Sequence, residues 1–222
     1  MQVGNARYRD ESDLAAVIPV FPLSGALLLP GGRMPLNIFE PRYLQMVDDA
    51  LAGNRHIGMI QPALDGCRRD DGEPALCRMG CMGRITSFAE TGDGRYIISL
   101  DGVTRFRVIE ELNVRTPYRQ ARVSHFIADL KQDEQESSID REALLAAFRA
   151  YLDANDMEAD WESVMRAGNV TLVNALSMMA PYGSAEKQAL LEAADLKARA
   201  DTLVAMTEMA LRDQDESPVN LQ

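Results

Sequence analysis

The 222-residue chain is poor in the residues that most enzymes use for catalysis, with two histidines, three cysteines and three lysines. None of the lysines follows a glycine, so the sequence lacks the Gly-Lys pair of a phosphate-binding P-loop. Neither His56 nor His125 has a serine or cysteine at a spacing typical of a catalytic triad. The sequence therefore excludes P-loop ATP hydrolysis and does not support a nucleophilic enzyme.

Long apolar runs and paired cysteines are also missing. No segment approaches the roughly 18 uninterrupted apolar residues of a membrane span, and the first 17 residues contain no apolar signal core. An odd number of cysteines is typical of a reducing compartment. We therefore expect a cytoplasmic protein with no membrane partner.

A metal site is a minor alternative that these cysteines leave open. Cys67, Cys77, Cys81 and His56 could be assembled into a zinc site, but structural zinc sites usually use tight C-x2-C pairs from turns. Cys77 and Cys81 are instead separated by three residues in a strand-like run. We interpret Cys81 as a small buried hydrophobic residue and predict neither a metal nor a cofactor.

Charge divides the chain into two parts. Residues 1–128 contain 15 basic and 15 acidic residues, whereas residues 129–222 contain 8 and 19, and 8 minus 19 gives the whole net charge of −11. This change and the polar stretch at 131–138 predict a β-rich domain over 15–128, a helical bundle over 129–213 and a disordered polar tail over 214–222. General nucleic-acid binders obtain their affinity from clustered lysine and arginine side chains that contact the phosphates. The second part of this chain is acidic, so we do not expect nucleic acid as the main partner.

The first part of the chain has the pattern of short strands and turns. Proline and glycine punctuation predicts a hairpin from residues 17–21 and 26–29, followed by a helix that begins at Pro41. A second hairpin is predicted from 96–100 and 103–109 around the Asp101-Gly102 pair. Six or so antiparallel strands with one helix are consistent with a small, partly open barrel.

The second part has helical periodicity throughout. Apolar residues recur at helical spacing, with Asn169, Ser184 and Asp195 placed to cap three of the helices. The predicted fold class is therefore α+β, with a β-rich domain that carries one main helix followed by an all-helical bundle.

Four stretches of the sequence resemble the amino-terminal LON domain of Lon-type ATP-dependent proteases. Residues 18–43 read IPVFPLSGALLLPGGRMPLNIFEPRY, 56–62 read HIGMIQP, 79–88 read MGCMGRITSF and 93–111 read DGRYIISLDGVTRFRVIEE. The resemblance covers most of the chain and implies a pseudo-barrel related to PUA domains. In full Lon proteases the corresponding region takes part in substrate recognition and assembly.

The rest of a Lon protease, an ATPase module and a serine–lysine peptidase module, has no counterpart here. The nearest spacing for a serine–lysine pair is Ser184 to Lys187, and we interpret Ser184 as a helix cap. The resemblance thus implies a non-catalytic protein that binds unfolded or apolar polypeptide segments, as an adaptor or chaperone-like binder, with a separate ATP-dependent protease as a further partner.

Methionine is the residue type most suited to such binding, because flexible thioethers let a surface adapt to different apolar segments. With 12 methionines in the chain, we predict a peptide-binding groove in part formed by the 30–36 loop and the domain junction. The candidate contacts are Met34, Leu36, Met178 and Met179.

Two other functions remain open. A basic strip on the sheet would accept RNA, a modified base or an acidic peptide, and its candidate residues are Arg84, Arg95, Arg105, Arg107 and Arg122. On that interpretation Arg105 and Arg107 face outward while Thr104, Phe106 and Val108 face the core. A small-molecule pocket or an unrecognised hydrolase is the third possibility, and it requires a perturbed acid or base in a cleft.

Overall fold

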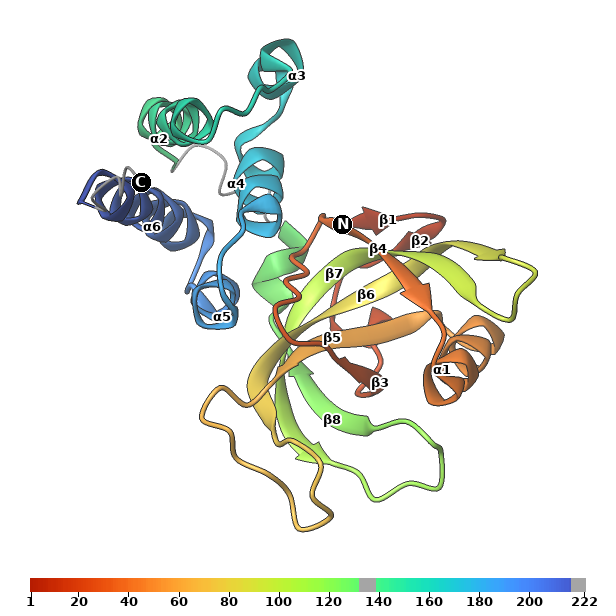
Figure 1. Cartoon of the computed structure of the whole chain (residues 1–222). Helices are drawn as coiled ribbons and strands as arrows, with labels where there is room; N and C mark the ends of the chain where they lie inside the picture. The colour runs from red at the N-terminus through yellow and green to blue at the C-terminus, as the bar shows by residue number, and fades with distance from the viewer. Residues whose placement is uncertain (132–138, 217–222) are drawn as a thin grey trace.

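The computed structural model describes residues 1–131 and 139–216 of the chain. In the first part of the chain, the elements in these residues are β1 (Gln2–Val3), β2 (Ala6–Arg7), the short 3-10 helix η1 (Glu11–Asp13), β3 (Val17–Pro22), β4 (Arg33–Ile38), α1 (Pro41–Ala52), β5 (His56–Pro62), β6 (Leu76–Glu90), β7 (Tyr96–Glu111) and β8 (Gln120–His125). In the second part they are α2 (Arg141–Ala154), α3 (Trp161–Arg166), α4 (Asn169–Met179), α5 (Ser184–Glu192) and α6 (Leu196–Glu216). Helices α2 to α6 lie on one side of the strands and α1 lies on the opposite side (Figure 1).

The six longer strands form a sheet that closes on itself. Their order is β4-β7-β6-β5-β3-β8, and β8 also pairs with β7. Strand β7 is long enough to serve two partners, because its first half pairs with β4 and its second half with β8. The ring of β7, β6, β5, β3 and β8 therefore closes, whereas β4 pairs with β7 alone and remains an edge strand. The predicted barrel-like sheet with helices is therefore present.

One pairing differs from the predicted all-antiparallel arrangement. Strands β3 and β5 run parallel, with Val20 opposite Gly58 and Phe21 opposite Met59. The 33 residues between them contain β4 and α1, and a parallel pair needs such a long crossover. Helix α1 begins at Pro41 as predicted, and its Tyr43 ring lies 4.2 Å from that of Phe21.

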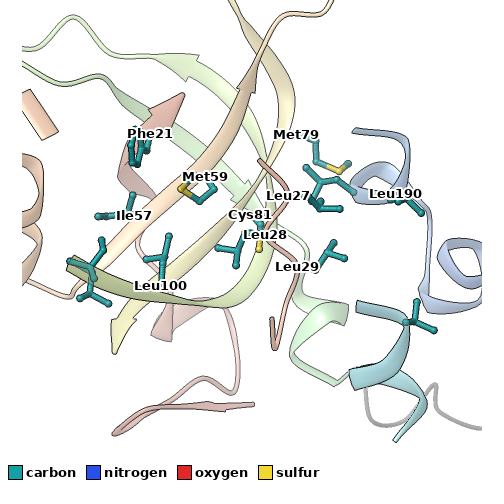
Figure 2. Close-up of a cluster of buried hydrophobic side chains, with 14 of the residues drawn as sticks. Phe21, Leu27, Leu28, Leu29, Ile57, Met59, Met79, Cys81, Leu100 and Leu190 are labelled. Atoms are coloured by element: carbon teal, nitrogen blue, oxygen red, sulfur yellow. The ribbon is translucent and has the colours of Figure 1, made fainter. Parts of the chain in front are cut away.

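The predicted strand at 26–29 is wrong. These residues form no strand, and β4 lies later, pairing with β7 instead of β3. Leu27, Leu28 and Leu29 are all buried, whereas a strand covered on one face would bury alternate residues. Figure 2 shows the reason, since the three leucines lie between Cys81 and Leu100 on the strands and Leu190 on α5.

The predicted hairpin turn at Asp101-Gly102 is also wrong. Strand β7 continues through both residues, and the sheet register shifts there opposite Gly83. A Cβ on Gly102 would lie 2.1 Å from the carbonyl oxygen of Leu29, so the glycine allows the leucine segment to approach the strand. The Asp-Gly pair marks a bulge and a close backbone contact, while the turn before β7 contains Gly94 at a φ of +85°.

The helix starts agree with the sequence in part. Asp195 accepts the backbone N–H of Ala198 at 2.8 Å and caps α6 as predicted. Asn169 and Ser184 are each the first helical residue, preceded by a glycine at the cap position, so both predicted caps are wrong. None of the described helices is both long and apolar enough to cross a membrane.

The polar tail was predicted to begin at residue 214. Helix α6 continues to Glu216, three residues into that segment. The remainder of the predicted tail, 217–222, lies outside the described residues.

A second cluster of buried side chains lies under the amino-terminal segment. Val3, Tyr8 and Leu14 pack against barrel residues that include Val20 and Phe106. The terminal ammonium group donates hydrogen bonds to the carbonyl oxygens of Tyr8 and Leu130, at 2.9 and 3.2 Å. These contacts hold residues 1–14 against the strands.

A buried arginine joins the strands to the helices. Arg105 on β7 donates from Nε and Nη2 to the two carboxylate oxygens of Asp129, both at 2.9 Å. Its Nη1 also donates to the carbonyl oxygens of Leu191, at 3.0 Å, and of Ala193, at the end of α5. A cation at a helix carboxyl end is favourable, because the last carbonyls carry partial negative charge. The contact therefore holds α5 against the barrel.

Candidate functional site

A large cavity lies among the helices, and most of its lining is apolar. We call it the main groove; its volume is about 680 Å³. The described residues that line it come from α2, the α2–α3 loop, α3, α4, the α4–α5 loop and α6, and are Leu144, Ala147, Phe148, Tyr151, Leu152, Met157, Glu158, Ala159, Asp160, Ser163, Val164, Ala167, Thr171, Leu172, Ala175, Leu176, Met179, Ala180, Pro181, Tyr182, Leu203, Val204 and Thr207. Pockets of 300 to 1,000 Å³ are typical of ligand sites.

The sequence of α4 explains why the groove is open on one side. Thr171, Ala175 and Met179 are spaced four residues apart and form one stripe of the helix. The first two side chains are small, so they leave space between α4 and the helices opposite. Leu172 and Leu176 beside them are buried and hold α4 in the core. The groove is thus a gap left by small residues on a well-anchored helix.

Two of the polar side chains in the lining of the main groove contact each other. The Tyr182 hydroxyl lies 2.8 Å from the Thr207 hydroxyl, and burial raises the pKa of Tyr182. The Thr207 hydroxyl also lies 2.8 Å from the carbonyl oxygen of Leu203. The hydroxyls are used in the fold, so the groove presents mainly carbon and sulfur to a ligand.

A smaller cavity, which we call the junction pocket, lies on the other side of the α4 stripe. It measures about 300 Å³ and is lined by Pro30, Gly31, Gly32, Arg33, Val170, Thr171, Asn174, Ala175, Met178 and Met179. Because Thr171, Ala175 and Met179 line both cavities, the two are neighbours along one face of α4. The Asn174 amide donates to the Pro30 carbonyl at 2.8 Å and holds the loop in place.

Methionine side chains lie at the edges of these cavities. Met179 is 78% exposed although it lines both cavities, and Met157, which lines the main groove, is 52% exposed. Such exposed, flexible apolar side chains are typical of surfaces that adapt to different partners.

The four predicted peptide contacts separate into two pairs. Met178 and Met179 lie at the junction pocket, which residues 30–33 of the predicted 30–36 loop also line. Residues 33–36 of that segment belong to β4, so the prediction of a loop there is wrong. Met34 and Leu36 lie on β4 opposite the buried residues Leu100 and Ile98, and their half-buried side chains pack against the core. Neither is among the described residues that line the two cavities, so of the four only the helical pair lines a cavity described above.

The predicted basic strip does not form as one surface. Arg105 was predicted to face outward, but its side chain is only 4% exposed and is used in the contact with Asp129. Arg122 and Arg95 form exposed ion pairs with Glu110 and Asp93. The strand alternation separates Arg105 from the face of Phe106, but it does not show that the helices bury the Arg105 face of β7.

The two remaining strip residues are also engaged. Arg84 donates to the carbonyl oxygen of Asn54 at 2.7 Å. The guanidinium of Arg107 lies 5.9 Å from the ring centre of Phe126. Arg107 further lines a third cavity, of about 540 Å³, with Cys77 and Glu192.

His56 and Cys81 are buried titratable groups whose pKa values are shifted by their surroundings. His56 lies 2.8 Å from the Tyr8 hydroxyl, and burial, with a smaller effect from Arg84, lowers the pKa of His56 to about 4. Burial raises the pKa of the Cys81 thiol. Among the described residues there is no group of three or more histidine, cysteine and acidic side chains that could hold a metal ion.

Ser184 and Lys187 do not bond to each other in the way that a catalytic pair would. The Ser184 hydroxyl lies 3.3 Å from that of Ser24. Lys187 donates to the carbonyl oxygen of Gly25 at 2.9 Å. Both side chains instead connect the start of α5 to the segment after β3.

The main groove itself was not anticipated from the sequence. Its lining comes from helices α2, α3, α4 and α6 and two loops, and helical periodicity identifies the faces without showing which faces meet. The one available signal was the spacing of Thr171, Ala175 and Met179. They form a stripe with two small side chains on a helix whose neighbouring positions are strongly apolar.

Comparison with known proteins gives one family. The family model described as the ATP-dependent protease La (LON) substrate-binding domain matches residues 17–208. The Lon protease 2 of Myxococcus xanthus is 30% identical over 201 residues, which cover 86% of this chain and 23% of that protein. The Lon protease of Parabacteroides distasonis is 30% identical over 200 residues, with 84% and 23% coverage. The chain therefore spans about a quarter of the length of these curated relatives.

Solved structures show the same fold. A Lon N-terminal domain protein from Xanthomonas campestris aligns with a TM-score of 0.63 at 24% identity, covering 86% of this chain and 98% of that one. The N-terminal domain of the Mycobacterium avium complex Lon protease aligns with a TM-score of 0.59 at 16% identity, with the same coverage. The family model, at residues 17–208, spans the sequence from β3 to α5 and extends into α6.

Proposed function

Because the chain belongs to the LON substrate-binding domain family, we propose that it binds polypeptide segments without cleaving them, and that the main groove and the junction pocket hold the bound segment. The observation that carries this proposal is the apolar lining of the main groove, about 680 Å³ in volume and open on one side. A pocket of this size accepts a few large apolar side chains of a partner chain.

The shape and chemistry of the two cavities support this function. The main groove and the junction pocket share the α4 stripe, so a segment lying along α4 would contact both. Met179 lies between them with most of its surface exposed and would lose that exposure on binding. Burial of apolar side chains is the main source of affinity, at about 25 cal/mol per Å².

The test is a binding measurement with a permanently unfolded, fluorescently labelled polypeptide, followed by anisotropy, with cleavage of the label checked in the same sample. We expect saturable binding and an intact label. Met179→Gln keeps the side-chain length but removes an apolar anchor, and it should weaken binding roughly fivefold to tenfold, the equivalent of about 1 to 1.4 kcal/mol.

Met165→Gln is the matched control. Met165 is 60% exposed on α3, but it is not among the described residues that line either cavity. This variant should bind like the unchanged protein. If both variants bound equally well, the groove would not be the binding site; if the unchanged protein did not bind at tens of micromolar, the proposed function would be wrong.

A separate ATP-dependent protease is the second part of the proposal. The matched relatives are named Lon proteases, and this chain aligns with about a quarter of their length. A binder that passes its clients to a protease should accelerate their degradation. The measurement is the rate of degradation of the bound polypeptide by a purified ATP-dependent protease, with Met179→Gln as the variant that should lose the effect.

A further inference from the structure

One wall of the main groove is acidic. Residues 153–160, which include the end of α2 and the α2–α3 loop, contain Asp153, Asp156, Glu158 and Asp160 and no basic residue. All four are exposed, and Glu158 and Asp160 line the groove directly. They are the charged residues among the described residues of the lining, and both are negative. A bound segment would therefore meet negative charge at this edge of an otherwise apolar surface.

The acidic charge at this edge is not neutralised by neighbouring arginines. Among the described residues, the carboxylates of Asp153, Asp156 and Glu158 take part in no ion pair. Asp160 accepts the backbone N–H and the hydroxyl of Ser163, and these hydrogen bonds lower its pKa, so that it stays ionised at neutral pH. The four carboxylates thus act together on the space beside the groove.

Three arginines of α2 and α3 contact groups other than these four carboxylates. Arg141 donates to the carbonyl oxygens of Val164, Met165 and Ala167 at the end of α3.

The two other arginines near this edge are also engaged. Arg166 pairs with Glu162, one turn away on α3. The guanidinium of Arg149 stacks over the Trp161 ring at 4.5 Å. The edge therefore keeps a local excess of negative charge.

We propose that the main groove selects polypeptide segments in which large apolar side chains are flanked by lysine or arginine. This inference rests on the proposed function and adds the charge of the preferred segment. The apolar side chains enter the groove, and the flanking cations lie beside the α2–α3 segment. Phe148 and Tyr151 in the same lining offer aromatic faces on which a cation can stack.

The test uses three labelled peptides with one apolar core, flanked on both sides by two lysines, two glutamines or two glutamates. We expect the lysine-flanked peptide to bind roughly tenfold more tightly than the glutamate-flanked one at low salt, because several charge pairs act across about 10 Å in water. Near 0.3 M salt the ratio should fall to about twofold, since screening shortens the range of these interactions.

A charge-neutralised variant locates the effect. Asp153→Asn, Asp156→Asn and Glu158→Gln are combined; asparagine suits position 156, where φ is +51°, because it tolerates the left-handed conformation. We expect the lysine-to-glutamate ratio to fall at least threefold at low salt, with the affinity of the glutamine-flanked peptide for the same variant as the reference.

The matched control changes the same number of charges far from the groove. Asp70→Asn, Asp71→Asn and Glu73→Gln lie in the loop between β5 and β6 and raise the net charge by the same amount. This control should leave the ratio unchanged. Equal binding of all three peptides would overturn the charge preference but leave the proposed function intact. An equal fall of the lysine-to-glutamate ratio in both variants would show a non-specific effect of net charge and would overturn the assignment to this edge. If none of the peptides bound, the proposed function would fail as well.

Discussion

Replacement of Arg105 by methionine should destabilise the protein strongly. Methionine preserves much of the aliphatic volume but removes the guanidinium, so Asp129 remains buried with only the backbone N–H of residue 105 as its donor from β7. Leu191 and Ala193 lose the same donor at the end of α5. Removing one partner of a buried ion pair typically costs 3 to 5 kcal/mol, and we expect about 4 kcal/mol here.

The chain contains a matched pair with the same geometry at the surface. Arg33 contacts Asp101 through Nε and Nη2, at 2.8 and 2.9 Å. The side chain of Arg33 is 70% exposed, whereas that of Arg105 is 4% exposed. Because water solvates the charges that remain, Arg33→Met should cost less than about 1 kcal/mol. The comparison therefore isolates the effect of burial from that of geometry.

The measurement is the free energy of unfolding from urea titrations of the two single variants and of the double variant Arg105→Met with Asp129→Leu. The double variant should recover at least about 1 kcal/mol relative to Arg105→Met, because it removes the uncompensated carboxylate. Equal, small losses for Arg105→Met and Arg33→Met would refute the reasoning. The reasoning would also be refuted if the double variant lost more stability than the losses of its two single substitutions added together.

Two further predictions concern single residues of the barrel. The pKa of His56 is about 4 in the folded protein and near 6.5 when unfolded, so its contribution to stability is complete above pH 6.5 and is lost progressively as the pH falls from about 6.5 to about 4. His56→Gln should remove roughly 2 kcal/mol of the loss of stability between pH 7 and 5, measured by urea unfolding at both pH values. Gly102→Ala should cost more than about 2 kcal/mol of stability in the same assay, because the new Cβ would lie 2.1 Å from the Leu29 carbonyl oxygen. The control Gly183→Ala should cost less than about 1 kcal/mol, because φ at that position is −69° and the near neighbour is the flexible end of Glu186. Unchanged pH dependence in the first case, or equal costs in the second, would contradict these arguments.

Local rules predicted the local features of this fold. Pro41 starts α1 because its fixed φ and missing N–H suit a first helical position, and Asp195 caps α6 through its carboxylate. Those outcomes depend on a few neighbouring residues. Sequence periodicity likewise placed strands before residue 128 and helices after it, since each pattern is repeated over many positions.

The errors share a different cause, which is contact between distant segments. The 26–29 segment is apolar enough for a strand, but it is buried on all sides between the barrel and α5. Asp101-Gly102 is a typical turn pair, yet the approach of Leu29 keeps β7 extended through it. Arg105 alternates correctly for an exposed face, but α5 covers that face. In each case a segment more than 60 residues away in sequence changes the outcome.

The same long-range contacts determine the candidate site. Arg199 on α6 donates to the Leu190 carbonyl on α5 and to the Asn174 side chain on α4, both at 3.0 Å. Asn174 in turn holds Pro30, next to the loop of the junction pocket. Because α4 forms a wall of both cavities, its position depends on hydrogen bonds that extend through α6 and α5 to Arg105 on the barrel. The shape of the two cavities therefore depends on contacts between the helices and the barrel, and helices excised from the barrel would lose those contacts.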